Sequence, residues 1–283
     1  MKRPFVKLQS ALARGLDWRL LLFWVLGMLL PTALMTVPIW RTLSEALDQY
    51  PLAQHVAERF DVLVFEDLRV TAQRSSPALA GGALVGLLLA VLVSPLLTAA
   101  IMASAAADER TFAGRATAWY GRALRLWLVS GIPLALLGTA WWALAKLVDN
   151  EAQRATLETR ADLASRLSLW AIALLGIVLH TSIELGRAEL AANPERRSAL
   201  LAWLRGTRKA MRQPFRTLLS YVVPTVLSLF LAALLSVLRL HLNAASQSGF
   251  WLGALVTQLA VAVVGWGRAS RLFALTALVR DEP

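Results

Sequence analysis

The chain has 283 residues, of which 57% are apolar and 17% are charged, with a formal net charge of +11 and no cysteine. Soluble domains carry about 45–50% apolar and about 25% charged residues, so this composition indicates a membrane protein. The lack of cysteine excludes disulfides and cysteine-ligated metal or iron–sulfur sites. No long linker rich in Pro, Gly or Ser divides the chain, and we expect residues 1–283 to form a single transmembrane domain.

A short amphipathic helix is expected before the first apolar stretch. Phe5, Leu8, Leu12 and Leu16 recur at helical spacing and form one apolar stripe. This helix would lie flat on the membrane surface before the chain turns into the bilayer at residues 17–19.

Six stretches are apolar and long enough to cross a hydrocarbon core of about 30 Å, which takes about 20 helical residues. Strands of a membrane barrel would be about ten residues long and would alternate in polarity, which these stretches do not. We therefore predict an all-α fold, a polytopic bundle of six transmembrane helices with short amphipathic helices at the interfaces. The predicted spans are 20–40, 78–105, 126–147, 167–183, 218–238 and 250–266.

The first connection, residues 41–77, is polar enough to lie outside the membrane. Thr42 followed by Glu45 fits a capping box that opens a short amphipathic helix, and Pro51 would end or kink that helix. A second helix would run through Phe60 and Val64. The two helices form either a small lid over the bundle or a return path between spans.

The second span carries small residues every four positions. Helices approach closely where small residues line one face, because van der Waals contact drives helix association in lipid. The stripe predicts either packing within the chain or a contact with a partner subunit. Its central members are Gly82, Gly86, Ala90 and Ser94.

Proline interrupts four of the predicted spans. A proline inside a helix removes one backbone hydrogen bond and commonly kinks the helix, so we expect kinks at these positions. They are Pro31, Pro95, Pro133 and Pro224.

One ionisable cluster is predicted at the end of the fourth span. His180, Glu184 and Arg187 follow one another at intervals of four and three residues, so the three side chains share one helix face. The cluster is either a site for a proton or a lipid headgroup, or a group of charges that closes a helix end. Residues 108–110 (DER) end span two, and Arg268 and Arg271 end span six on the same side; pairing between these ends is expected to clamp the bundle.

The fourth connection contains a second amphipathic helix. Asn193 is the expected cap and Pro194 the first helical residue, and the helix would end near residue 212. It would bind anionic lipid headgroups, dock to another protein, or act only as a topology signal. Its apolar arc contains Leu200, Trp203, Leu204, Ala210 and Met211, and its basic arc contains Arg197, Arg205, Arg208, Lys209 and Arg212.

The distribution of basic residues predicts the orientation of the chain. Lys and Arg number 20 in the N-terminal segment, the second and fourth connections and the C-terminal segment, against 9 in the other three connections. The excess marks the first group as cytoplasmic. We therefore expect both termini in the cytoplasm. Only 4 of the 29 basic residues are Lys, a usage typical of a GC-rich genome, and this favours a bacterial origin. The basic face suits anionic lipids rather than nucleic acid.

The sequence contains no signature of catalysis or of a cofactor. It has no phosphate loop, no HExxH zinc motif and no GxSxG nucleophile elbow, and its three histidines are scattered. No Asp or Glu lies well inside a predicted span, where ion-coupled carriers usually place such groups. We therefore expect no catalytic, metal or cofactor-binding residue.

Three short runs carry a resemblance: 184–189 (ELGRAE), 197–199 (RSA) and 213–218 (QPFRTL). With them the chain resembles poorly characterised bacterial six-helix inner-membrane proteins, and it is similar in layout to the membrane domain of some glycerophosphodiester phosphodiesterases. The resemblance implies the six-helix layout and no activity, because no segment matches the phosphodiesterase catalytic domain.

Two functions fit these observations. The first is a non-catalytic integral inner-membrane subunit or scaffold that packs against other membrane subunits or against copies of itself. The alternative is a permease-like transporter or lipid-handling protein gated near His180.

Overall fold

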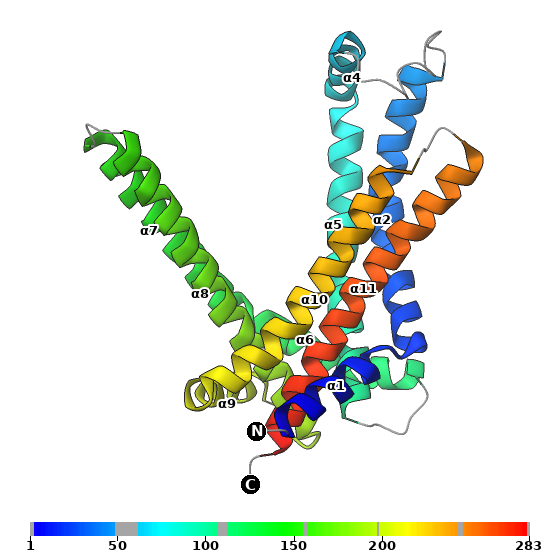
Figure 1. The fold of residues 1–283 in the computed structure, drawn as a ribbon. Coiled ribbons are helices and arrows are strands. Elements are labelled where there is room, and N and C mark those ends of the chain that lie inside the picture. The colour runs from blue at the N-terminus through cyan, green and yellow to red at the C-terminus, as the bar shows by residue number, and fades with distance from the viewer. Residues whose placement is uncertain are drawn as a thin grey trace. The chain divides into compact units, whose positions relative to one another are not determined.

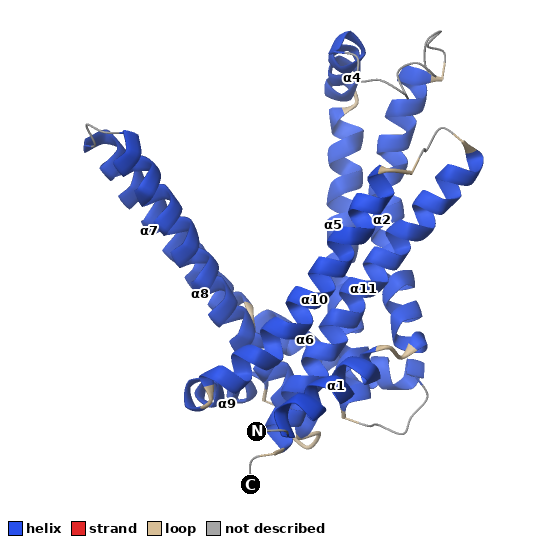
Figure 2. Cartoon of the chain, in the orientation of Figure 1, coloured by secondary structure: helices blue, strands red, loops and turns tan. Residues whose placement is uncertain are grey.

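The computed structural model describes residues 3–48, 62–106, 112–154, 158–196, 198–242 and 246–281 (Figures 1 and 2). In this part of the chain all regular structure is helical and no strand occurs, which confirms the all-α prediction. The helices are α1 (Arg3–Gly15), α2 (Trp18–Leu47), α4 (Val62–Arg74), α5 (Ser76–Ala105), α6 (Phe112–Val129), α7 (Gly131–Arg154), α8 (Glu158–Ala192), α9 (Ala199–Arg212), α10 (Pro214–Leu240) and α11 (Gln247–Arg280).

Six helical segments within the described residues are long and apolar enough to cross a membrane, which confirms the number of predicted spans. Each extends beyond the predicted boundaries at one end or at both, and the third comprises α6 and most of α7. They are Trp18–Leu47, Ser76–Ala105, Ala113–Asn150, Asp162–Ala192, Pro214–Leu240 and Gln247–Arg280.

The third predicted span is not one continuous helix. α6 ends at Val129 and α7 begins at Gly131, so the predicted stretch 126–147 starts in the last turn of α6. Pro133 is the third residue of α7. In the first turn of a helix the backbone N–H groups have no intrahelical acceptor, so the missing N–H of proline costs no hydrogen bond there. Pro31, Pro95 and Pro224, in contrast, lie inside the continuous helices α2, α5 and α10.

The predicted capping box at Thr42 is wrong. α2 continues through Leu47, and the Thr42 hydroxyl donates to the carbonyl of Pro38 within the same helix at 3.0 Å. The helix predicted through Val64 exists as α4, and Val64 is buried. Pro51 and Phe60 lie outside the described residues.

The chain divides into two compact units. The first comprises the described residues within Met1–Leu12, Thr98–Val223 and Ser270–Pro283, and the second those within Ala13–Leu97 and Pro224–Ala269. Four of the described helices, α1, α5, α10 and α11, contribute residues to both units.

The first unit is built around α8. α7 and α8 form a hairpin in which the two helices lie side by side, and α9 and α6 pack against the other end of α8 (Figure 1). α8 and α9 approach most closely at two glycines: a Cβ on Gly206 would lie 2.8 Å from the backbone nitrogen of Gly186. Only glycine allows this approach of two backbones, because any side chain would meet main-chain atoms.

The second unit also uses glycine where helices meet. A Cβ on Gly86 of α5 would meet the side chain of Met35 and lie 3.0 Å from the carbonyl oxygen of Pro31, both on α2. A Cβ on Gly265 of α11 would lie 2.6 Å from the ring of Trp24. Small residues thus set the contacts among these helices, as expected where lipid is the solvent.

Candidate functional site

The end of α8 that follows the hairpin is buried as a whole. Every residue from 181 to 191 is buried, whereas no residue from 162 to 180 is. The buried stretch contains Gly186, Ala188 and Ala191, whose small side chains let the neighbouring helices approach. It also contains Glu184, whose side chain is 1% exposed.

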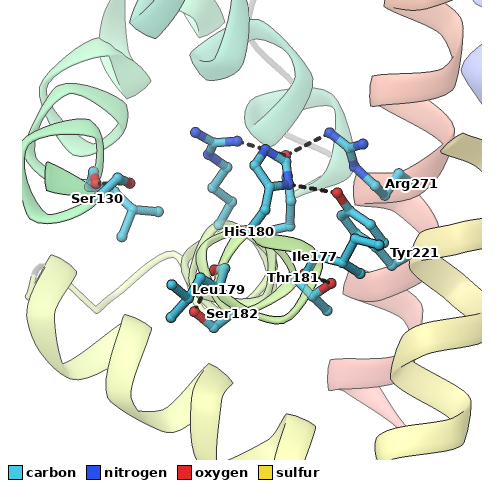
Figure 3. Close-up of polar contacts among 11 residues, drawn as sticks. Ser130, Ile177, Leu179, His180, Thr181, Ser182, Tyr221 and Arg271 are labelled. Carbon is cyan, nitrogen blue, oxygen red and sulfur yellow. Dashed lines mark hydrogen bonds and ion pairs between the residues drawn. The ribbon is translucent and has the colours of Figure 1, made fainter. Parts of the chain in front are cut away.

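Glu184 binds two arginines. Its Oε1 accepts a hydrogen bond from Nη1 of Arg187 at 2.7 Å, one turn further along α8, and another from Nη2 of Arg271 of α11 at 2.8 Å (Figure 3). The side chains of Arg187 and Arg271 are 9% and 11% exposed. Hydrogen bonds between ionised partners are about twice as strong as neutral ones, and their strength rises where water is excluded.

His180 and Tyr221 extend this cluster to α10. Nε2 of His180 lies 4.0 Å from Oε1 of Glu184, and its Nδ1 is 2.9 Å from the hydroxyl oxygen of Tyr221 (Figure 3). The guanidinium of Arg271 lies over the Tyr221 ring, 4.9 Å from its centroid, which adds a cation–π contact. These five side chains, from three helices, are called the Glu184 cluster below.

The sequence predicted part of this cluster. His180, Glu184 and Arg187 share one face of α8 and converge as expected. Arg271 was expected to pair with the end of span two, but its partner in the cluster is Glu184, and residues 108–110 lie outside the described residues. Tyr221 was missed. The available signal was a tyrosine near a span end, because a buried tyrosine hydroxyl needs a hydrogen-bond partner.

The geometry suits a structural clamp. One carboxylate oxygen is held by two guanidinium groups, and the cluster ties α8 to α10 and α11 inside the first unit. A buried ion pair adds little stability over well-packed apolar residues of equal volume, but removing one partner leaves a buried charge and is costly. Such a group therefore specifies which helix faces meet.

Around the cluster, polar side chains fix α9 and the end of α8. Nε1 of Trp203 donates to the hydroxyl of Ser182 at 3.0 Å. The predicted start of α9 at Pro194 is wrong, because the amide of Asn193 donates to the Glu189 carbonyl at 3.2 Å and ends α8.

α9 begins instead at Ala199, after the N-cap Ser198, whose hydroxyl accepts from the backbone N–H of Leu201. The predicted lipid contact of Lys209 is also wrong. Lys209 is 6% exposed, and its ammonium donates to the carbonyl of Val279 of α11 at 3.0 Å. The side chain is therefore enclosed within the first unit. Arg205, Arg208 and Arg212 are exposed, and Arg197 lies outside the described residues.

The small-residue stripe of α5 lies partly against α2. A Cβ on Gly82 would lie 2.5 Å from the Pro38 ring, and Gly86 is buried against the same helix. Ala90 and Ser94 are half-buried.

The hairpin offers only shallow hollows. One, of about 280 Å³, lies between α7 and α8 and is lined by Leu144, Leu147, Val148, Ala164, Leu167, Ser168 and Ala171. Among the described residues, no group of His, Asp and Glu side chains has a geometry that could hold a metal ion.

Comparison of the chain with protein-family models, with curated proteins and with solved structures finds no match. The resemblance in layout stated above therefore stays a prediction.

Proposed function

We propose that this protein is a non-catalytic integral membrane subunit or scaffold, and that its α7–α8 hairpin packs against the transmembrane helices of a partner subunit or of a second copy. The observation that carries the proposal is the exposure of the hairpin. No residue of α8 from 162 to 180 is buried, and large apolar side chains such as Trp170, 73% exposed, point outward.

Lipid could surround an apolar hairpin equally well. A second feature of the hairpin favours contact with partner helices. Gly131 and Gly138 lie on α7, where Ala135 falls between them at helical spacing, and nothing lies within 4 Å of a Cβ placed on either glycine. Glycine lowers helix propensity by about 1 kcal/mol relative to alanine, which no contact within the described residues offsets here. Small residues at this spacing are typical of helix–helix interfaces in membranes.

The Glu184 cluster supports the same function. Its carboxylate is engaged by two guanidinium groups from its own chain, and the cluster lies where α8 becomes buried. A rigid base of this kind would hold the hairpin at a fixed angle to the helices that clamp it. A scaffold needs such a base, because its partner must find the hairpin already oriented.

Photo-crosslinking tests the proposal in the intact membrane. A photoreactive amino acid is placed at Trp170 or Leu134, both exposed on the hairpin, and as a control at Leu185, which is 0% exposed. We expect Trp170 and Leu134 to give an adduct with one defined membrane protein or with a second copy, in a fixed ratio to the chain. Leu185 should give only internal adducts. Adducts with lipid alone, from a chain that purifies as a monomer, would reject the scaffold and favour the permease.

We infer in addition that the chain spans a bacterial inner membrane with both termini in the cytoplasm, supported by the basic residue counts of 20 against 9. Because the chain has no cysteine, single cysteines report the side of the membrane without background. Asp149→Cys and Ser246→Cys should react with an impermeant thiol reagent in intact cells, and Glu195→Cys and Asp281→Cys only after lysis. The reverse pattern would invert the topology.

A further inference from the structure

α9 has three distinct faces. At 100° per residue, one face is buried and two neighbouring faces are exposed, one apolar and one basic. The buried face holds Ala199, Ala202, Gly206 and Lys209; the exposed apolar face holds Leu200, Leu204 and Met211; the exposed basic face holds Arg205, Arg208 and Arg212, with the exposed Leu201 between them.

The buried face holds α9 against the other helices of the first unit. Gly206 brings the helix against the backbone of α8, and the Lys209 ammonium bonds the carbonyl of Val279 of α11. Trp203 adds a third contact through its bond to Ser182. The buried face therefore fixes the orientation of the two exposed faces. The apolar side chains of α9 remain exposed even though its buried face packs against α8 and α11.

The exposed faces differ in chemistry but lie side by side. Met211 is 78% exposed and Leu204 is 49% exposed. Beside them, the three arginines at positions 205, 208 and 212 follow one another at intervals of three and four, so they form a single basic stripe. A helix with adjacent apolar and basic stripes matches the boundary between acyl chains and anionic headgroups.

The position of α9 along the chain points to the same boundary. Candidate spans end at Ala192 before it and begin at Pro214 after it, so six residues and one residue connect the helix to the membrane segments. Such short connections keep α9 close to the bilayer surface. At the start of the next span, the apolar side chain of Phe215 is also 87% exposed.

We propose that α9 binds the anionic phospholipid headgroups of one leaflet through Arg205, Arg208 and Arg212, while Leu200, Leu204 and Met211 enter the acyl boundary. Lys209 takes no part in this contact, because its side chain is enclosed. The inference is independent of the proposed scaffold function, since it concerns a different surface. A soluble acidic protein would match the arginines, but it would leave the apolar stripe in the polar headgroup region.

Lipid retention by the full chain tests the headgroup contact. The purified protein in mild detergent is offered equal amounts of phosphatidylglycerol and phosphatidylcholine, and native mass spectrometry counts the lipids retained. An arginine near an anionic surface strengthens binding by about fivefold. The variant R205Q/R208Q/R212Q should therefore lose its preference for phosphatidylglycerol by at least about that factor, as should the unaltered protein at high salt.

A matched control removes the same charge elsewhere. R69Q/R74Q/R166Q alters three arginines of α4 and α8, two of which form exposed ion pairs with Glu66 and Asp162. This variant should keep the preference for phosphatidylglycerol. Equal retention of both lipids by the unaltered protein, or equal losses in the two variants, would overturn the proposal.

The depth of the apolar stripe provides a second readout. Single-cysteine variants Leu204→Cys and Met211→Cys, each spin-labelled, are reconstituted in bilayers that contain phosphatidylglycerol. Their labels should be accessible to oxygen and shielded from a water-soluble nickel relaxant. A label at Arg208→Cys should be accessible to both oxygen and the nickel relaxant. Labels at Leu204 and Met211 that are fully accessible to the nickel complex would place α9 in water and favour a soluble protein partner.

Discussion

The two ends of α8 show opposite relations between polarity and burial. The exposed stretch 167–179 reads LSLWAIALLGIVL and carries no charge; only Ser168 and the indole of Trp170 can hydrogen-bond through a side chain. The buried stretch 181–191 reads TSIELGRAELA and contains two carboxylates and one guanidinium. In a soluble protein the apolar stretch would be inside. Here it lies outside, because lipid tails are as apolar as leucine and polar groups must find partners within the protein.

The difference teaches where the specificity of this fold resides. Apolar side chains of the hairpin gain no hydrophobic energy by leaving lipid, so burial alone does not select one neighbour over another, and selection requires close packing or polar pairing. The Glu184 cluster does select, because Glu184 of α8 must meet Arg271 of α11, and His180 of α8 must meet Tyr221 of α10, for their polar groups to be paired as they are here. The buried end of α8 is therefore expected to be sensitive to substitution, and the exposed end tolerant of it.

The largest effect is expected from breaking the Glu184 cluster. Glu184→Gln keeps the shape but leaves the guanidinium groups of Arg187 and Arg271 without their carboxylate, and removing one partner of a buried ion pair costs about 3–5 kcal/mol. We expect a clear fall in the unfolding midpoint of the purified protein, followed by tryptophan fluorescence in lipid nanodiscs. Asp162→Asn, which breaks an ion pair on the exposed end of α8 with side chains 72% and 55% exposed, should cost about 0–1 kcal/mol.

A combined variant sharpens this prediction. Replacing Glu184 by Gln together with Arg187→Met and Arg271→Met removes all three charges, and apolar replacement of a whole buried ion cluster is often neutral. Most of the lost stability should return. If Glu184→Gln and Asp162→Asn cost the same, the two ends of α8 do not differ in the way proposed.

The next largest effect is expected at the crossing of α8 and α9. Gly206→Leu places its Cβ 2.8 Å from backbone atoms of Gly186 and Leu185, so the helices must separate. Overpacking of this kind costs about 1–3 kcal/mol. Gly121→Leu on α6, where nothing lies within 4 Å of a Cβ, is the matched control and should leave the unfolding midpoint almost unchanged. A harmless Gly206→Leu would mean that α9 does not rest on α8 as described.

Sequence periodicity was sufficient for whatever depends on one helix alone. The six spans followed from the length and polarity of single stretches, and the convergence of His180, Glu184 and Arg187 followed from helical spacing. Arg271 and Tyr221 lie 87 and 41 residues away from their partners, Glu184 and His180, and no local pattern encodes such a pairing.

The errors came from local signals that tertiary structure overrides. Lys209 falls on the basic arc of α9, but close packing at Gly206 turns that side toward α8, and the carbonyl of Val279 receives the ammonium. The glycine was a usable signal, because glycine within a helical pattern often marks a close approach. Asn193 and Ser198 are both good N-cap residues. The side-chain amide of Asn193 is bonded to the Glu189 carbonyl at the end of α8, and Ser198 is the N-cap of α9.

A smaller effect is expected at His180, which lies where the exposed and buried ends of α8 meet. Tyr221→Phe removes the hydroxyl that lies 2.9 Å from Nδ1 of His180, and an intramolecular hydrogen bond contributes about 1 kcal/mol. His180→Phe should cost a similar amount, and the double variant no more than about either one alone, because both remove the same bond. Unfolding in nanodiscs measures all three. Fully additive losses would show that the two side chains act separately.

The smallest effect on stability, and the most direct test of the exposed end, is expected from Gly138→Leu. A leucine there meets nothing within 4 Å of its Cβ, so the stability of the isolated chain should change by no more than about 0.5 kcal/mol. In the membrane, however, the new side chain occupies the open space beside Gly138, and a partner helix could no longer approach this face of α7. Crosslinks from Trp170 to the partner should therefore disappear while the unfolding midpoint stays unchanged. Gly121→Leu, an equal change on α6, should keep the crosslinks. If Gly138→Leu keeps the crosslinks, the partner does not bind through this face of α7. If Gly138→Leu unfolds the chain, this face of α7 is packed against other parts of the same chain and is not open to a partner.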